Sequence, residues 1–247
     1  MSNKVVKLTV VTDFTCLSCC VGEHELLNAI SHCQEAELPL SFEIEHIPFQ
    51  LICSGALSDA DSGKYQKEEF LGKRLGEEKF TKLKSAILKW ADEKGVPISF
   101  RGCMSQSTRA HRLCQKAFQL GGQSYQVPLI CAIFKAHMEE GKDIADINVL
   151  SDLAAHNKVM SKDQAIAFLN SNELEAEVHA MCKEARTNGV SAVPMVIIDG
   201  KWAVKGGQSS DVFVQIFKKL AYCGVHSAPS PFAGPVIDTQ PMNTMVA

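Results

Sequence analysis

The chain has 247 residues, of which 46% are apolar, and its 25 basic and 28 acidic side chains give a formal net charge of −3. Without a basic cluster, this charge argues against binding to nucleic acid or to a membrane surface. No run of about 18 apolar residues is present, and the first four residues lead directly into a short strand rather than into a secretory signal. We therefore expect a soluble, cytoplasmic protein.

The ten cysteines are spread over the whole chain. With no signal peptide, we expect a reducing compartment, in which most of these residues are ordinary buried thiols. Cys16 and Cys19 form the one Cys-x-x-Cys pair. A zinc site would require a second paired set of Cys or His ligands, so we predict no metal site.

The first 47 residues predict a strand, a helix and a second strand. Residues 5–12 are almost continuously apolar, as in a strand that is covered on both faces. Apolar residues have helical spacing from residue 18 to about residue 33, and residues 40–47 alternate between apolar and polar side chains. This order favours a right-handed βαβ unit with two parallel strands.

The Cys-x-x-Cys pair lies where the first strand gives way to the helix. Cys16 is then at the helix N-terminus, where free backbone N–H groups and the helix dipole favour a thiolate. We predict that Cys16 is the nucleophile, in an exposed position, and that Cys19 is more buried because it lies one turn into the helix.

The middle of the chain has a helical period throughout, which predicts an inserted helical subdomain between about residues 61 and 184. The apolar positions that define its helices are Phe80, Leu83, Ile87, Trp90 and Ala91, then Ala110, Leu113, Ala117 and Leu120, then Ile130, Ile133, Phe134 and Met138, then Val149, Leu150 and Leu153, and finally Ala165, Ile166 and Leu169.

The sheet is predicted to resume with a strand over residues 190–198, an Asp199-Gly200 turn and a strand over residues 201–204. Pro194 cannot donate to a sheet ladder, so it requires an edge or a strand start. A last amphipathic helix follows. We predict a discontinuous domain of residues 1–60 and 185–226, the insertion 61–184, and a Pro-rich C-terminal tail, 227–247.

Four segments together resemble the FrnE-like branch of the DsbA family: Asp13–Gly22, Ser107–Leu113, Gly189–Ile197 and Gly206–Gln208. The resemblance implies an α/β thioredoxin fold with an inserted all-helical subdomain, a redox-active Cys16/Cys19 pair, and a cis-proline at Pro194 beside that pair. The family also includes kappa-class glutathione transferases and chromene-carboxylate isomerases, which resemble this chain in architecture but typically carry Ser at the position of Cys16.

Two positions depart from the family pattern. Leu17-Ser18 replaces the usual Pro-Trp between the cysteines, and Cys20 replaces a common aromatic residue. Ser18 either donates a hydrogen bond to the thiolate or helps to begin the helix. Cys20 either resolves a mixed disulfide, as Cys19 does in the family pattern, or is a buried, inert thiol.

The sequence favours thiol–disulfide exchange through Cys16 and Cys19, with substrate held by Val193, Pro194, Ser18 and His111 in an open groove. We expect no bound cofactor and a thiol or disulfide as partner. The alternative is a glutathione-dependent transferase or isomerase that holds a small molecule in a closed pocket. A binding module without activity is a third hypothesis, and a homodimer is compatible with the sequence.

Overall fold

The computed structural model describes residues 3–53, 56–58 and 61–222, so the predicted tail 227–247 lies outside the described residues. One mixed sheet has the strand order β2-β1-β3-β4. The strands are β1 (Lys4–Thr12), β2 (Leu40–Pro48), β3 (Met195–Ile198) and β4 (Trp202–Lys205). β1 is parallel to β2 and antiparallel to β3, and β3 is antiparallel to β4. The predicted parallel pair and the predicted hairpin are both confirmed.

The prediction of a strand over residues 190–198 was too long, because β3 begins only at Met195. Pro194 has no N–H to donate to a ladder, and it therefore stands immediately before a central strand instead of inside it. Its carbonyl still accepts a hydrogen bond from the Gly206 N–H at 2.9 Å, which continues the pairing with the segment after β4.

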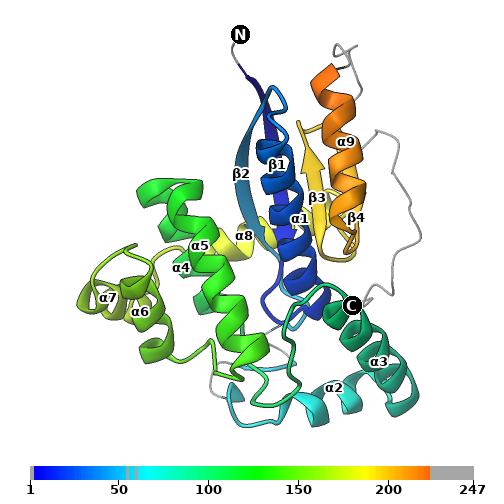
Figure 1. Cartoon of the computed structure of the whole chain (residues 1–247). Helices are drawn as coiled ribbons and strands as arrows, with labels where there is room; N and C mark the ends of the chain where they lie inside the picture. Colours follow the sequence, from blue (N-terminus) through cyan, green and yellow to red (C-terminus); the bar gives the residue numbers. More distant parts are fainter. Residues whose placement is uncertain (1–2, 54–55, 59–60, 223–247) are drawn as a thin grey trace.

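Helices cover both faces of the sheet (Figure 1). α1 (Leu17–Glu35) and α9 (Ser210–Tyr222) lie side by side on one face, where their apolar side chains form one core cluster with β1, β2 and β3. α8 (Glu175–Thr187) packs against β2 from the other face, where the Cys182 thiol donates to the Pro48 carbonyl at 3.4 Å. Both faces are covered at the C-terminal end of β1, from Val10 to Thr12. At the other end Val5 is 46% exposed and Lys7 is exposed, so the prediction of a strand covered on both faces was wrong there.

Between β2 and α8 the chain is helical, as predicted. The elements are α2 (Lys67–Leu75), α3 (Glu77–Glu93), α4 (Thr108–Gly121), α5 (Gln123–Phe134), the π-helical turn η2 (Lys135–Glu139), α6 (Ile147–His156) and α7 (Lys162–Asn170). The sequence pattern missed α2, because this helix buries only Lys67, Leu71 and Gly72 and has no apolar stripe.

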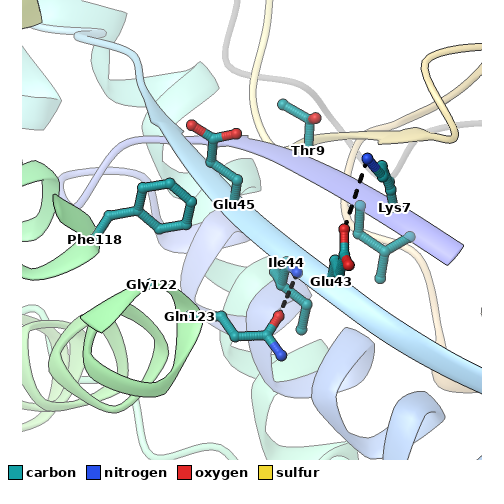
Figure 2. A pocket seen from close by; sticks show the side chains of 9 residues that line it. Lys7, Thr9, Glu43, Ile44, Glu45, Phe118, Gly122 and Gln123 are labelled. Carbon is teal, nitrogen blue, oxygen red and sulfur yellow. Dashed lines mark hydrogen bonds and ion pairs between the residues drawn. The ribbon is translucent and has the colours of Figure 1, made fainter. Parts of the chain in front are cut away.

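The insertion is fastened to the edge strand β2 by two glutamines of α5. Gln123 accepts from the Ile44 N–H at 2.5 Å and donates to the Phe42 carbonyl at 3.1 Å (Figure 2). Gln126 accepts from the His46 N–H at 2.9 Å and donates to the His46 carbonyl at 3.2 Å. Two side-chain amides thus replace the backbone partners that an edge strand otherwise lacks.

A cavity of about 310 Å³ opens at this edge, lined by residues of β1, β2, α4 and the start of α5 (Figure 2). Two of its charged side chains, Lys7 and Glu43, form an exposed ion pair at 3.8 Å. Within the described part of the chain, no helix combines the length and apolarity that a membrane crossing requires.

Candidate active site

Cys16 is the N-cap of α1, and backbone groups surround its sulfur. The Cys19 N–H donates to Cys16 Sγ at 3.2 Å, and the Cys16 thiol faces the Val193 carbonyl at 3.6 Å. The Cys16 N–H donates to the Asp13 carbonyl at 3.1 Å, which holds the loop before the helix. A helix N-terminus with an N–H directed at sulfur supplies a donor for negative charge that develops on Cys16 Sγ during a reaction.

Cys19 is placed to remain a thiol while Cys16 reacts. Its pKa is raised well above the ordinary value, first by burial and then by the hydrogen bond and charge of Cys16. The prediction that Cys16 is exposed was wrong, however, because both sulfur-bearing residues are only 1% exposed. A helix start is usually exposed, but here Cys16 and Cys19 both belong to a core cluster that includes side chains of the insertion.

Cys20 is half-buried, and its pKa is raised to about 12. Burial is the main cause, and the negative charges of Cys131, Cys16 and Glu23 add to it. A thiol with this pKa has almost no thiolate at neutral pH, but the pKa of Cys19 is raised as well, so the inert interpretation of Cys20 stays a prediction.

The predicted substrate-binding residues Val193, Pro194 and Ser18 lie near the helix start. The Val193–Pro194 peptide bond is cis, and a Cβ at Gly22 of α1 would stand 3.1 Å from Pro194 Cγ. Ser18 is the second residue of α1, and its backbone position makes it part of the first helical turn.

The predicted open groove beside Cys16 was wrong for this conformation. Val193 is 2% exposed, Ser18 is 7% exposed, and Pro194 is buried as well. Cavities of about 310, 370 and 540 Å³ lie elsewhere, and Cys16 lines none of these three. The physical reason is that apolar side chains of the insertion pack against this end of the sheet instead of standing apart as groove walls.

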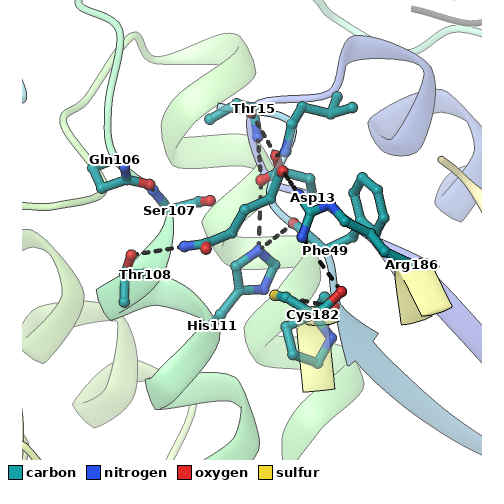
Figure 3. Close-up of polar contacts among 12 residues, drawn as sticks. Asp13, Thr15, Phe49, Gln106, Ser107, Thr108, His111, Cys182 and Arg186 are labelled. Atoms are coloured by element: carbon teal, nitrogen blue, oxygen red, sulfur yellow. Dashed lines mark hydrogen bonds and ion pairs between the residues drawn. The ribbon is translucent and has the colours of Figure 1, made fainter. Parts of the chain in front are cut away.

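His111, the remaining predicted site residue, is buried on α4 and bonded to the loop before Cys16. Its Nε2 lies 3.0 Å from the Phe49 carbonyl and 3.5 Å from Asp13 Oδ1 (Figure 3). The imidazole also packs on Phe14, with ring centroids 4.9 Å apart. The structure therefore connects His111 to the cysteine loop through Asp13 and Phe14.

Asp13 is a residue whose role the sequence analysis missed. Its carboxylate is fully buried and accepts from the Thr15 N–H at 3.2 Å, the Thr15 hydroxyl at 2.8 Å and the Leu51 N–H at 2.7 Å (Figure 3). Burial raises the pKa of Asp13, but the hydrogen bond and charge of His111 and the other hydrogen bonds outweigh burial, and the net pKa is lowered. A charged residue directly after an apolar strand and before Cys-x-x-Cys was the available signal.

The chain also matches a family model that spans Cys16, Cys19 and the cis Pro194. The model, described as a DSBA-like thioredoxin domain, matches residues 7–218. The chain belongs to this family. Membership confirms the predicted thioredoxin fold with its helical insertion, and family members are oxidoreductases or isomerases. No curated protein has a sequence that matches the chain significantly.

Solved structures of similar fold include members of both activity classes. A probable DsbA oxidoreductase from Streptomyces coelicolor has a TM-score of 0.74 at 20% identity, covering 91% of this chain and 93% of that one. The cytosolic disulfide reductase DsbM from Pseudomonas aeruginosa, solved with GSH, has a TM-score of 0.57 at 16% identity, covering 88% and 100%. A 2-hydroxychromene-2-carboxylate isomerase has a TM-score of 0.60 at 15% identity, covering 87% and 94%.

Proposed function

We propose that the protein is a thiol–disulfide oxidoreductase in which Cys16 attacks and Cys19 resolves. The observation that carries this proposal is the position of Cys16 Sγ at the cap of α1, 3.2 Å from the Cys19 N–H, while Cys19 itself is held as a thiol. The two sulfurs thus differ in reactivity, as a two-step exchange requires.

In the first step the Cys16 thiolate attacks one sulfur of a substrate disulfide. A bond from Cys16 to that sulfur forms, the substrate S–S bond breaks, and the other sulfur leaves as a thiolate. Cys19 then loses its proton and attacks Cys16 Sγ, which forms the Cys16–Cys19 disulfide and releases the second substrate thiolate. The enzyme loses two electrons and the substrate gains them. The reverse sequence oxidises a dithiol.

Val193 and Pro194 border the reacting sulfur in this scheme. The Val193 carbonyl, 3.6 Å from Cys16 Sγ, accepts the thiol hydrogen in the resting dithiol, so the proton is located before reaction. His111 is connected to the site through Asp13, which lies 3.5 Å from its Nε2, and through Phe14, on which it packs.

The proposal is tested by reduction of a model disulfide with purified protein and by trapping. We expect Cys16→Ser to abolish the activity and Cys19→Ser to accumulate a mixed disulfide at Cys16 that mass spectrometry identifies. Cys20→Ser is the matched control and should keep most of the parent activity. A Cys16→Ser variant with full activity would refute the mechanism.

A second candidate is a glutathione-dependent transferase or isomerase acting on a small molecule. The burial of Cys16 favours it, because a buried sulfur without an open groove is better suited to a small substrate than to a folded protein. In that case a serine at position 16 could still activate glutathione. Turnover of a small electrophile by Cys16→Ser, together with no disulfide exchange in the parent protein, would favour this candidate.

A further inference from the structure

Trp90 of α3 covers the backbone beside Pro194. A Cβ at Gly207 would lie 2.1 Å from Trp90 Cη2, so the indole lies directly on this glycine. A Cβ at Gly22 would in turn stand 3.6 Å from Gly207 Cα and 3.1 Å from Pro194 Cγ. The indole thus covers Gly207, whose chain neighbour Gly206 donates to the Pro194 carbonyl at 2.9 Å, and Trp90 itself is 4% exposed.

α3 lies across the end of the sheet at which α1 begins (Figure 1). Its inward residues belong to the same core cluster as Cys16. Within the described residues, none of the three cavities named above is lined by Cys16, which is 1% exposed. A substrate can therefore reach the sulfur only if a covering element moves.

The ends of α3 suit such a movement. Gly76 precedes the helix with φ +82°, Gly95 follows it with φ +66°, and no atom lies within 4 Å of a Cβ built on either glycine. Glycine adopts this left-handed backbone without strain and tolerates changes of φ and ψ that other residues resist. Each glycine is thus free of contact at its Cβ position, whereas the adjacent residues Leu75 and Val96 pack in or against the core cluster.

One ion pair fastens the C-terminal end of α3 to the thioredoxin domain. Lys94 Nζ lies 3.0 Å from Glu25 Oε2 of α1, and the same oxygen accepts from the Ser210 N–H at the start of α9 at 2.8 Å. Glu25 is buried, and its position at the N-terminus of α9 is favourable for a carboxylate. Lys94 is the partner that must separate from it when α3 moves.

We propose that Trp90 is the gate residue of the Cys16 site and that it selects for small disulfides over extended polypeptides. Rotation of α3 about Gly76 and Gly95 lifts the indole from Gly207 and exposes the backbone beside Pro194. A small displacement admits a low-molecular-weight disulfide, whereas a polypeptide laid along Pro194 requires the whole indole to leave. This proposal rests on the proposed function of Cys16, but the gate controls access to the sulfur and can be measured without disulfide exchange.

The test is alkylation of Cys16, which needs no turnover. Peptide mass mapping follows the modification of Cys16 by iodoacetamide and by a maleimide carried on a polyethylene glycol chain. In Trp90→Ala we expect the rate with the large reagent to rise at least about tenfold and the rate with iodoacetamide to rise far less, since a tenfold change in the open population requires only about 1.4 kcal/mol. Trp202→Ala, on β4 in the other core cluster, is the control and should change neither rate.

Lys94→Met loosens the same helix without leaving a cavity, so it tests the proposal even if Trp90→Ala does not fold. We expect it also to raise the rate with the large reagent more than the rate with iodoacetamide. Equal increases for both reagents, or no increase in either variant, would overturn the gate. A size-selective effect on labelling without disulfide exchange by the parent protein would support the gate and refute the proposed function. Disulfide exchange by the parent protein without a size-selective effect would support the proposed function and refute the gate.

Fluorescence gives a second measurement. In Trp202→Phe the emission comes from Trp90 alone, because the chain has two tryptophans. We expect acrylamide to quench this emission poorly in the free protein and more strongly once a bulky group is attached to Cys16. Unchanged quenching after attachment would mean that the indole stays on Gly207, contrary to the proposal.

Discussion

Replacing Asp13 by asparagine tests the electrostatics beneath the cysteine loop with almost no change in shape. Every group that faces the carboxylate is a donor: the Leu51 N–H, the Thr15 N–H and the Thr15 hydroxyl. His111 Nε2 belongs with them, because it lies 3.0 Å from the Phe49 carbonyl, which can only accept. An asparagine amide has one oxygen, so its NH₂ group must face donors on one side.

The magnitude follows from this geometry. At least one buried backbone N–H loses its acceptor, which costs about 1–3 kcal/mol. The remaining hydrogen bonds no longer go to a charged acceptor, so the contribution of each falls from about 1.5–3 kcal/mol to about 1 kcal/mol. We therefore expect Asp13→Asn to lower the free energy of unfolding by about 3–5 kcal/mol at pH 7, a large share of a typical domain's stability.

Urea unfolding followed by far-ultraviolet circular dichroism measures this difference. The control is Asp61→Asn, whose carboxylate is 44% exposed and pairs with Lys64 at 3.1 Å, and which should change the free energy of unfolding far less than Asp13→Asn does. The pKa of Asp13 is lowered in the folded protein, so its stabilising effect is present above its unfolded pKa and is lost as the pH falls through the folded pKa. The difference from Asp13→Asn should accordingly narrow below about pH 4. A loss no greater than that of Asp61→Asn would refute the reasoning.

Three further predictions concern buried polar groups of the insertion. Burial lowers the pKa of Lys67 to about 8. The free energy of unfolding of the parent protein, relative to that of Lys67→Met, should therefore rise between about pH 8 and pH 10. At pH 7 Lys67→Met should be no less stable than the parent. Burial lowers the pKa of His137 to about 3, so the free energy of unfolding should fall as the pH drops from 6.5 towards 3. In urea titrations His137→Asn should reduce this loss at acid pH. The control His179→Asn, on the exposed side of α8, should not. Gln126→Ala removes the acceptor of the His46 N–H and should lower the free energy of unfolding by about 2–4 kcal/mol, measured in the same way.

Helical periodicity predicted the insertion well because its helices are strongly amphipathic. In α3, the five positions expected to be apolar and inward are the five buried residues of the helix. α2 has no such stripe, so the pattern contained no signal for it. The boundaries of the discontinuous domain and of the insertion stay predictions.

The state of the candidate site could not be predicted from local sequence. The position of Cys16 at the cap of α1 depends on a few adjacent residues, and it was predicted. The burial of Cys16 depends on side chains of the insertion, and the role of Asp13 depends on Leu51 and His111, which are distant in the chain. Such contacts follow from the tertiary fold, which residue spacing alone does not determine.

The departure of Leu17-Ser18 from the family's usual dipeptide can now be understood in terms of which groups touch the sulfur. Apart from the Cys19 thiol, the partners of Cys16 named above are backbone groups: the Cys19 N–H and the Val193 carbonyl at Sγ, and the Asp13 carbonyl at the Cys16 N–H. These groups do not depend on which side chains stand between the cysteines, so the donor at the helix start is kept. The dipeptide also acts on packing, because Leu17 is 1% exposed and belongs to the same core cluster as Trp90. The substitution therefore bears on the packing around Cys16 as well as on the redox chemistry of its sulfur.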